Sequence, residues 1–306
     1  MAKKYQLIVV GGGPAGLTAG LYSARAGFTV LLIEKEVIGG QIANAERVDN
    51  YPGFPKGISG FELVQLIQQQ AMNHGLETMS GEVTGLTSGY GNNMVSTTEG
   101  DFIAQAVIIA GGLQFRKLEV PGENEFMGRG VSYCATCDGP LFRDKTVAVI
   151  GGGDTALTDA LSLSKFASLV KVIHRRNQLR ASKVLQGKAR ADPKIEFIWD
   201  SVVTEVKGEK KVTDLMLKNT QNGTISLLAV DGVFVAIGLI PNTEYLRGVL
   251  PLDEWGYIVT TELMETTVQG IFAAGDIRHN SVKQAIAAAG DGAVAALSAE
   301  KFVDSL

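Results

Sequence analysis

Cysteine and histidine are scarce in this sequence, which has two cysteines and three histidines among 306 residues. A small secreted protein held together by disulfides uses more cysteines, so such a framework is excluded. A structural zinc site usually needs four ligands, and His74, His174 and His279 lie far from Cys134 and Cys137 with no paired spacing. We therefore expect no metal, and we expect the two cysteines to carry chemistry.

The sequence also lacks a long apolar segment and a strong net charge. No stretch is long enough to span a membrane. The apolar run Leu7–Val10 is too short for the core of a signal peptide, and no small-residue cleavage site follows it. The net charge of −4 argues against a nucleic-acid-binding surface. We therefore expect a cytoplasmic protein with neither a membrane nor a nucleic acid as its partner.

Glycine, in contrast, is abundant, with 37 residues, and it marks a degenerate internal repeat. The apolar run Leu7–Val10 leads into the turn Gly11–Gly16, and Thr146–Ile150 leads into the turn Gly151–Ala156. Each turn opens a helical pattern that is followed by a second apolar run. Two strand–helix–strand units of matched length predict two nucleotide-binding domains.

The segments around the turns predict the rest of the fold. We expect helices over 17–26, 157–166 and 284–296, strands over 29–33, 106–110, 169–173 and 232–237, and antiparallel hairpins within 77–105 and 196–229. Glycines at 111–112 and 238 mark expected crossings between the domains. The part after Pro241 is too short for a domain, so we expect it to pack on the first domain.

The two glycine turns have the spacing of a dinucleotide-binding motif. Gly11, Gly13 and Gly16 match its full form, and Gly151, Gly153 and Ala156 match the form that ends in alanine. Such a turn lets the backbone approach a pyrophosphate, which then lies at the N-terminus of the following helix. An ordinary glycine-rich turn is the alternative, but strand, helix and a terminal polar residue occur in both copies.

The residue that ends the second strand differs between the two units. Glu34 and His174 each stand 23 residues after the first glycine of their turn (11 to 34 and 151 to 174). A carboxylate accepts hydrogen bonds from ribose hydroxyls and repels a 2′-phosphate. Arg175 and Arg176 follow His174, with Arg180 nearby, and guanidinium groups bind phosphate. We therefore expect FAD at the first turn and NADPH at the second, with a solvated basic patch as the alternative for the arginines.

The cysteines form the short motif Cys134-Ala-Thr-Cys137. This spacing suits a redox dithiol, because a short loop lets the two sulfurs meet and lowers the pKa of one of them. A zinc site and an incidental pair are the alternatives. Asp138 follows directly, and we interpret it as a general acid or base for the thiols, with a turn cap before Gly139 as the alternative.

These motifs, in this order, resemble those of the low-molecular-weight thioredoxin reductases of the bacterial and archaeal type. They are Ser132–Gly139, Gly151–Ala156, His174–Arg176, Ala273–Asp276 and Gln284–Ile286, and the resemblance covers essentially the whole chain. It implies an α/β fold with two Rossmann-like three-layer nucleotide-binding domains, the second inserted in the first. The implied bounds are 1–115 and 243–306 for the FAD domain and 116–242 for the NADPH domain. The resemblance also implies a homodimer.

The resemblance further assigns cofactor contacts to single residues. Those implied for FAD are Gly11, Gly13, Gly16, Glu34, Gly40, Gln41, Asn50, Asp276, Lys283, Gln284 and Ala285. Those implied for NADPH are Gly151, Gly153, Asp154, Thr155, His174, Arg175, Arg176 and Arg180. The chain departs from the family in two places, because Lys283 stands where arginine is usual and Thr158-Asp159 replaces a pair that is often Glu-Glu.

The implied activity is that of a thioredoxin-disulfide reductase. Electrons pass from NADPH through FAD and the Cys134–Cys137 disulfide to thioredoxin or a thioredoxin-like protein. The chain lacks the N-terminal thioredoxin-like extension of the related peroxide-system reductases, so we expect a separate protein partner. Three other functions remain as alternatives: a small-molecule dithiol oxidase, which could share every motif, a flavoprotein that reduces ferredoxin or another carrier with idle cysteines, and a non-catalytic NADPH sensor. Reduction of thioredoxin with consumption of NADPH separates the reductase from the oxidase, and carrier reduction that survives replacement of both cysteines would support the second alternative. A sensor needs neither FAD nor the cysteine pair.

Overall fold

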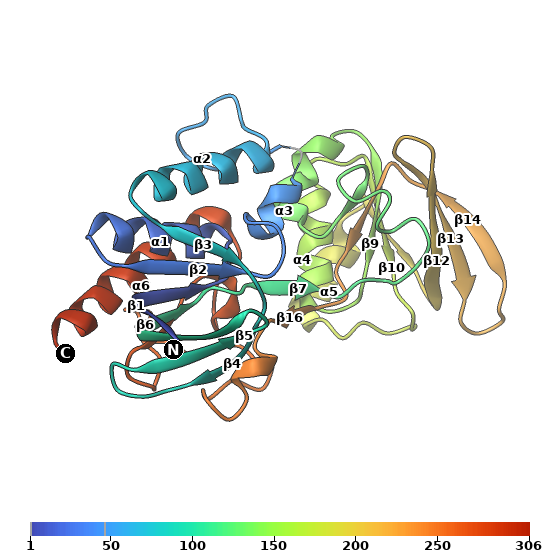
Figure 1. Cartoon of the computed structure of the whole chain (residues 1–306). Coiled ribbons are helices and arrows are strands. Elements are labelled where there is room, and N and C mark those ends of the chain that lie inside the picture. The colour runs from blue at the N-terminus through green and yellow to red at the C-terminus, as the bar shows by residue number, and fades with distance from the viewer. Residues whose placement is uncertain (1, 46) are drawn as a thin grey trace. The chain divides into compact units, whose positions relative to one another are not determined.

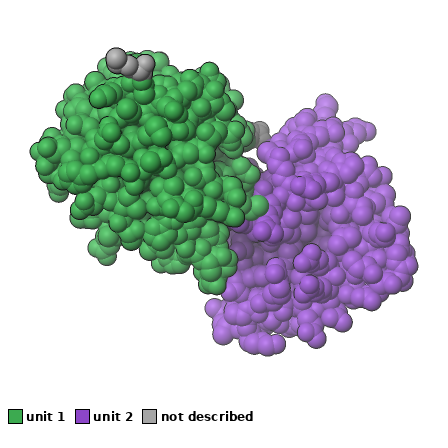
Figure 2. Space-filling model, turned by 60° about the horizontal axis from the view of Figure 1, so that its bottom comes forward, with its two compact units in different colours: residues 1–114, 240–306 green, residues 115–239 purple. Residues whose placement is uncertain are grey.

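The computed structural model describes residues 2–45 and 47–306. The chain forms two compact units, which Figure 2 shows in different colours. Unit 1 consists of Met1–Gln114 and Ile240–Leu306, and unit 2 consists of Phe115–Leu239. Each unit contains a parallel sheet with helices, so the predicted α/β class is confirmed.

Unit 1 is built on a parallel sheet that continues the first strand–helix–strand repeat (Figure 1). Its parallel strands lie in the order β3 (Glu77–Ser80), β2 (Val30–Glu34), β1 (Lys3–Val10), β6 (Gly100–Ile109) and β17 (Ile271–Ala273). The first half of β6 also pairs antiparallel with β5 (Asn93–Thr97), which pairs with β4 (Val83–Thr87). The strand from the C-terminal part of the chain therefore completes the sheet that the N-terminal part begins.

Helices cover one face of this sheet. They are α1 (Pro14–Arg25), α2 (Gly60–Asn73) and α6 (Ala285–Asp304), and single turns occur at η1 (Gly40–Asn44), η3 (Glu244–Leu246) and η4 (Gly275–Ile277). Helices α1 and α6 pack on each other and on the sheet (Figure 1). The apolar end of β1 is buried on both faces, because the segment 245–258 and strands β4 and β5 cover the other side. Burial on both faces explains why Leu7–Val10 is apolar without alternation.

Unit 2 repeats this plan with a second parallel sheet. Its strands lie in the order β11 (Ile195–Ile198), β10 (Leu169–Ile173), β9 (Thr146–Ile150), β15 (Gly232–Val235) and β8 (Val131–Ser132). On one face lie α3 (Ala135–Asp138), η2 (Gly139–Phe142), α4 (Asp154–Leu163) and α5 (Lys183–Ala191). An antiparallel sheet of β12 (Ser201–Gly208), β13 (Val212–Asn219) and β14 (Ile225–Ala229) covers the other face.

The segments where the chain leaves and re-enters unit 1 are extended. They form the short strands β7 (Leu113–Phe115) and β16 (Leu239–Pro241), which pair with each other. Asn242 fixes the neighbouring glycines, because its backbone N–H donates to Gly112 O over 3.2 Å and its side chain donates to Gly111 O over 2.7 Å. The two passages between the units therefore lie side by side.

The structure corrects several predicted elements. Helices α1 and α4 begin at Pro14 and Asp154, three residues before the predicted starts. Proline suits the first position of α1, and an acidic residue suits the first turn of α4. The segments 77–80 and 195–198 were predicted as parts of hairpins, and that is wrong, because they pair parallel with β2 and β10 as edge strands. Their alternation of polar and apolar residues reflects partial burial and says nothing about strand direction. The antiparallel hairpins β4–β5 and β13–β14 are confirmed, and α6 runs eight residues beyond the predicted end, to Asp304 rather than 296.

Two glycines of α6 give a matched test of its packing against α1. A Cβ on Gly292 would lie 2.1 Å from the Ala15 carbonyl oxygen, whereas a Cβ on Gly290 would meet nothing within 4 Å. We predict that Gly292→Ala lowers the free energy of unfolding by about 1–3 kcal/mol, because it forces α1 and α6 apart. Gly290→Ala should raise it by about 0.5–1 kcal/mol, because alanine favours the helix. Urea unfolding of both variants checks this, and equal effects would show that the close approach is unimportant.

Candidate functional site

The first glycine turn brings α1 unusually close to β1. A Cβ on Gly16 would lie 1.8 Å from the Gly11 carbonyl oxygen, and Gly11 has a φ of +106°, so neither position accepts a side chain without strain. Gly13 is the N-cap of α1, and no side chain caps the first N–H groups of the helix. These uncapped N–H groups and the helix dipole favour an anion such as a pyrophosphate.

Glu34 is anchored beside this turn at the end of β2. Its Oε2 accepts a hydrogen bond from Gly12 N over 2.6 Å, and its Oε1 accepts one from Glu36 N over 2.9 Å. A carboxylate has about four acceptor positions, so two remain for ribose hydroxyls. The backbone therefore fixes the direction of a carboxylate that the sequence predicted for this place.

The remaining residues predicted for FAD come from distant parts of unit 1. Gly40 is the first residue of η1 and lies beside the first glycine turn. A Cβ built on Gly13 would be 3.9 Å from the Gly40 Cα. Gln41 donates a long hydrogen bond of 3.4 Å to Leu113 O. Asn50 donates to Gln284 Oε1 over 3.1 Å, although 234 residues separate them.

The start of α6 supplies the last group of these residues. Gln284 is the N-cap of α6 and Ala285 is its first residue. Asp276 lies in η4, and its Oδ1 accepts a hydrogen bond from Ser281 over 2.9 Å. Burial raises the pKa of Asp276, although the Ser281 hydroxyl and the Lys283 charge act against this. Lys283 Nζ lies 5.8 Å from the centre of the Tyr257 ring, a contact that the sequence did not predict.

The second glycine turn also leaves a helix N-terminus open. Gly153 is the N-cap of α4, so no side chain caps the first N–H groups of this helix. Asp154 Oδ1 accepts a hydrogen bond from Ser182 N over 2.6 Å, which ties the start of α4 to the start of α5. The backbone N–H groups of Arg180 and Ala181 donate to Gly152 O over 2.8 and 3.1 Å. The loop that carries the arginines is therefore hydrogen-bonded directly to the second glycine turn. Thr155, in the first turn of α4, is exposed.

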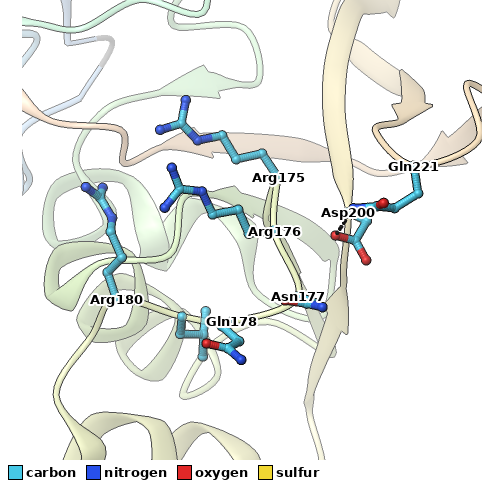
Figure 3. Close-up of a pocket in the computed structure, with 8 residues that line it drawn as sticks. Arg175, Arg176, Asn177, Gln178, Arg180, Asp200 and Gln221 are labelled. Atoms are coloured by element: carbon cyan, nitrogen blue, oxygen red, sulfur yellow. Dashed lines mark hydrogen bonds between the residues drawn. The ribbon is translucent and has the colours of Figure 1, made fainter.

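The predicted arginines line a pocket of about 300 Å³. Figure 3 shows the side chains of Arg175, Arg176 and Arg180 extending to the same side, with Asp200 and Gln221 on the other. All three arginines are exposed, and none forms a salt bridge within residues 2–45 and 47–306. Their guanidinium groups are available to a phosphate. The sequence did not single out Asp200 and Gln221. Asp200 directly precedes β12, and Gln221 lies in the turn between β13 and β14.

His174 contacts both this loop and the second glycine turn. It is only 5% exposed, its Nε2 lies 3.0 Å from Gln178 O, and a Cβ on Gly152 would lie 2.3 Å from its ring. Burial lowers the pKa of His174. A neutral ring held by the protein backbone fits a supporting role better than direct binding of a phosphate.

Cys134 and Cys137 form a disulfide, with Cα atoms 5.3 Å apart. Cys134 is the N-cap of α3, and its Sγ accepts a hydrogen bond from Cys137 N over 3.2 Å. A backbone N–H that points at a sulfur stabilises a thiolate there after reduction. Cys137 is exposed and Cys134 is half-buried.

A buried glutamate organises the chain before the cysteines. Glu123 is 1% exposed and accepts hydrogen bonds from the N–H groups of Leu118 and Glu119, both over 2.8 Å. It also accepts one from the Tyr133 hydroxyl over 2.7 Å, and the Tyr133 ring stacks on Phe115 at 4.9 Å. The sequence does not reveal this residue, because glutamate is usually exposed and nothing in its neighbourhood marks it as buried.

Two further features bear on the type of site. Within the described residues, no group of three or more His, Cys, Asp or Glu side chains is placed to hold a metal ion. Nor does that part of the chain contain a helix that is long and apolar enough to cross a bilayer.

Comparison with known proteins agrees with this geometry. Residues 5–292 match the family model described as pyridine nucleotide-disulphide oxidoreductase. The chain is 43% identical to the thioredoxin reductase of Bacillus subtilis (strain 168) over 305 residues, 99% of this chain and 96% of that protein. It is 46% identical to the thioredoxin reductase of Streptomyces coelicolor over 309 residues, 100% and 96% of the two chains.

Solved structures give the same result. The thioredoxin reductase from Streptococcus pyogenes MGAS5005 superposes with a TM-score of 0.96 at 40% identity and covers all of both chains. That from Lactococcus lactis, in the FR conformation, gives 0.68 at 43% identity and covers 99% of this chain and 100% of that one. The resemblance seen in the motifs is confirmed: the chain belongs to the thioredoxin reductases, within the pyridine nucleotide-disulphide oxidoreductase family.

Proposed function

We propose that this chain transfers electrons from NADPH, with FAD as its resident cofactor, through the Cys134–Cys137 disulfide to the disulfide of thioredoxin or a thioredoxin-like protein. One observation carries the proposal. The disulfide lies at the N-terminus of α3, next to Asp138, in the same unit as the arginine-lined pocket. The names of the relatives support thioredoxin as the partner. We further propose that the protein works as a cytoplasmic homodimer, as the family resemblance implies.

The residues of unit 1 fit FAD. The uncapped start of α1 at Gly13 suits the pyrophosphate, and the anchored Glu34 carboxylate suits the adenosine ribose. Asn50, Asp276 and Gln284 supply polar groups from distant parts of the sequence of unit 1. When bound, FAD supplies the two-electron link between a nicotinamide and a disulfide.

The residues of unit 2 fit NADPH. The open N-terminus of α4 suits its pyrophosphate, and Arg175, Arg176 and Arg180 suit its 2′-phosphate. His174 holds the arginine loop through Gln178. No carboxylate takes the place that Glu34 occupies in unit 1, so a 2′-phosphate is not repelled there.

The protein's own chemistry is dithiol–disulfide exchange. In the reduced pair, the Cys134 thiolate attacks one sulfur of the partner disulfide, so a mixed disulfide forms and one partner thiolate leaves. Cys137 then gives its proton to Asp138 and attacks Cys134 Sγ, which re-forms the Cys134–Cys137 bond and releases the second partner thiolate. Two electrons pass to the partner. The N–H of Cys137 donates to the Cys134 sulfur and would stabilise a thiolate there, which supports Cys134 as the attacking thiol.

Both the nicotinamide and the disulfide have to reach one flavin, yet they belong to the same unit. We therefore propose that unit 2 rotates relative to unit 1 about the paired segments β7 and β16. Two solved relatives support this, because they are about equally similar in sequence but superpose on the whole chain with TM-scores of 0.96 and 0.68.

The arginines predict the choice of nucleotide. Changing Arg175 and Arg176 together to alanine should raise KM strongly for NADPH and little for NADH, since two charged contacts to a phosphate are worth about 3–6 kcal/mol. Steady-state kinetics with both nucleotides checks this. Arg190→Ala is the control, because it removes an exposed arginine of the same unit that lies over the Phe197 and Trp199 rings. An equal rise in KM for NADH and NADPH would refute the assignment.

The geometry of the disulfide predicts which cysteine attacks the partner. Cys137→Ser should form a stable mixed disulfide through Cys134 with a thioredoxin that carries one activated cysteine, because no second thiol resolves the bond. Cys134→Ser should form far less of this complex under the same conditions. Mass spectrometry of the non-reduced products identifies the linked residue. Efficient capture by Cys134→Ser alone would reverse the two roles, and thioredoxin reduction at the wild-type rate by both variants would refute the mechanism.

A further inference from the structure

Ser132 connects the two halves of the redox site. It is the last residue of β8, and its side chain is buried, with 5% exposed. Its Oγ lies 2.6 Å from Asp138 Oδ2 and 3.1 Å from the backbone N of Cys134. One hydroxyl therefore touches both the carboxylate beside Cys137 and the backbone of Cys134.

The direction of these hydrogen bonds follows from the groups involved. A serine hydroxyl has one proton to donate, whereas the Cys134 N–H can only donate. Ser132 therefore accepts from Cys134 and gives its proton to Asp138, because the alternative acceptor, Cys134 O, is 3.5 Å away and uncharged. A hydroxyl that donates to a carboxylate at 2.6 Å makes a charge-assisted bond, which favours the ionised carboxylate.

We propose that Ser132 is a positioning residue for the thiol chemistry: it aims the Asp138 carboxylate at the redox pair and sets the pH at which Asp138 takes up a proton. The proposal rests on the proposed role of Asp138 as the base that receives the Cys137 proton. Because the same hydroxyl accepts the Cys134 N–H, reorientation of the cysteine loop also moves the carboxylate. The hydrogen bonds of its hydroxyl go to Asp138 and to the backbone of Cys134, so Ser132 acts on the thiol chemistry through Asp138.

Other titratable groups surround α3 and have to be separated from Asp138. Within unit 2, α3 packs against α4 and η2. Helix α4 carries Asp154, which accepts the Ser182 N–H, and Asp159, whose pKa burial raises to about 6. Segment η2 (Gly139–Phe142) has no titratable side chain. Tyr133 packs against the core cluster that includes Val131 and Val233 of the sheet. Asp159 is therefore tested beside Asp138, because a buried carboxyl group on the helix that packs against α3 can contribute to the pH profile, as can the two thiols of the reduced protein.

The test follows the reaction of the chemically reduced protein with the aromatic disulfide dithiobis(nitrobenzoate) across pH. This probe needs neither thioredoxin nor NADPH. The acid limb is the part of the pH profile in which the rate falls as the pH is lowered. Asp138→Asn should abolish the part of this limb that belongs to Asp138, whereas Asp159→Asn should leave it in place. Ser132→Ala should move this limb to higher pH by about one unit, because a carboxylate that loses a charge-assisted hydrogen bond holds its proton more tightly. The rate at high pH should stay within about twofold of the wild type, since Asp138 is ionised there in both proteins.

Two matched variants distinguish positioning from general damage. Ser132→Thr keeps the hydroxyl and should restore the wild-type limb. Ser201→Ala removes another buried serine hydroxyl of unit 2, which donates to Trp199 O over 2.8 Å, and should leave the limb unchanged. If Ser132→Ala does not fold, Ser132→Val, which has the shape of Ser132→Thr but no hydroxyl, should raise the limb in its place.

The outcomes separate this inference from the proposed function. A Ser132→Ala protein that reacts more slowly at every pH, with its limb in place, overturns the inference. So does an Asp138→Asn protein that keeps the limb. Failure of every variant and of the wild type to reduce thioredoxin, with the pH shift present, contradicts the proposed function and leaves the Ser132 assignment standing.

Discussion

The close approach between helix and strand at the first glycine turn is the constraint on which the nucleotide site depends. Only glycine fits at position 16, because any Cβ there would lie 1.8 Å from the Gly11 carbonyl oxygen. The same closeness exposes the first N–H groups of α1 toward the space that a pyrophosphate needs. Small residues of η4 and α6 extend this packing, since a Cβ on Gly275 or Gly292 would lie 2.9 Å from the Ala15 Cβ or 2.1 Å from the Ala15 carbonyl oxygen. The C-terminal segment with Asp276 and Gln284 is thereby brought to the turn.

The second unit uses the same scaffold for a different purpose. Strand β17 in unit 1 and strand β8 in unit 2 take the same place in their sheets, beyond β6 and β15 respectively. In unit 1 this strand leads to Asp276, and in unit 2 it leads to Ser132 and Cys134. Ligands of open parallel sheets bind outside the carboxyl ends of the strands. One sheet position thus leads to a proposed cofactor contact in the first unit and to the redox pair in the second.

Local patterns in the sequence were enough to predict the two glycine turns, the redox pair and the arginine loop. Each of these depends on residues a few positions apart, so spacing alone constrains it. The contact of Asn50 with Gln284 joins residues 234 apart, and only the family resemblance suggested both. The Ser132–Asp138 bond depends on the turn of α3, and the burial of Glu123 depends on three donors from two segments. Strands β3 and β11 were misassigned because a half-buried strand shows the same alternation in either direction.

The central claim is that the Cys134–Cys137 disulfide stores an electron pair between the flavin and the protein partner. Anaerobic titration with NADPH, followed by absorption spectra, tests this most directly. The wild-type protein should bind one FAD per chain and take up two electron pairs per chain, one in the flavin and one in the disulfide. The double variant Cys134→Ser/Cys137→Ser should take up only one, and oxidised thioredoxin should then reoxidise the wild type alone. Equal uptake by the two proteins, or reoxidation of the double variant by thioredoxin at the wild-type rate, would contradict the account.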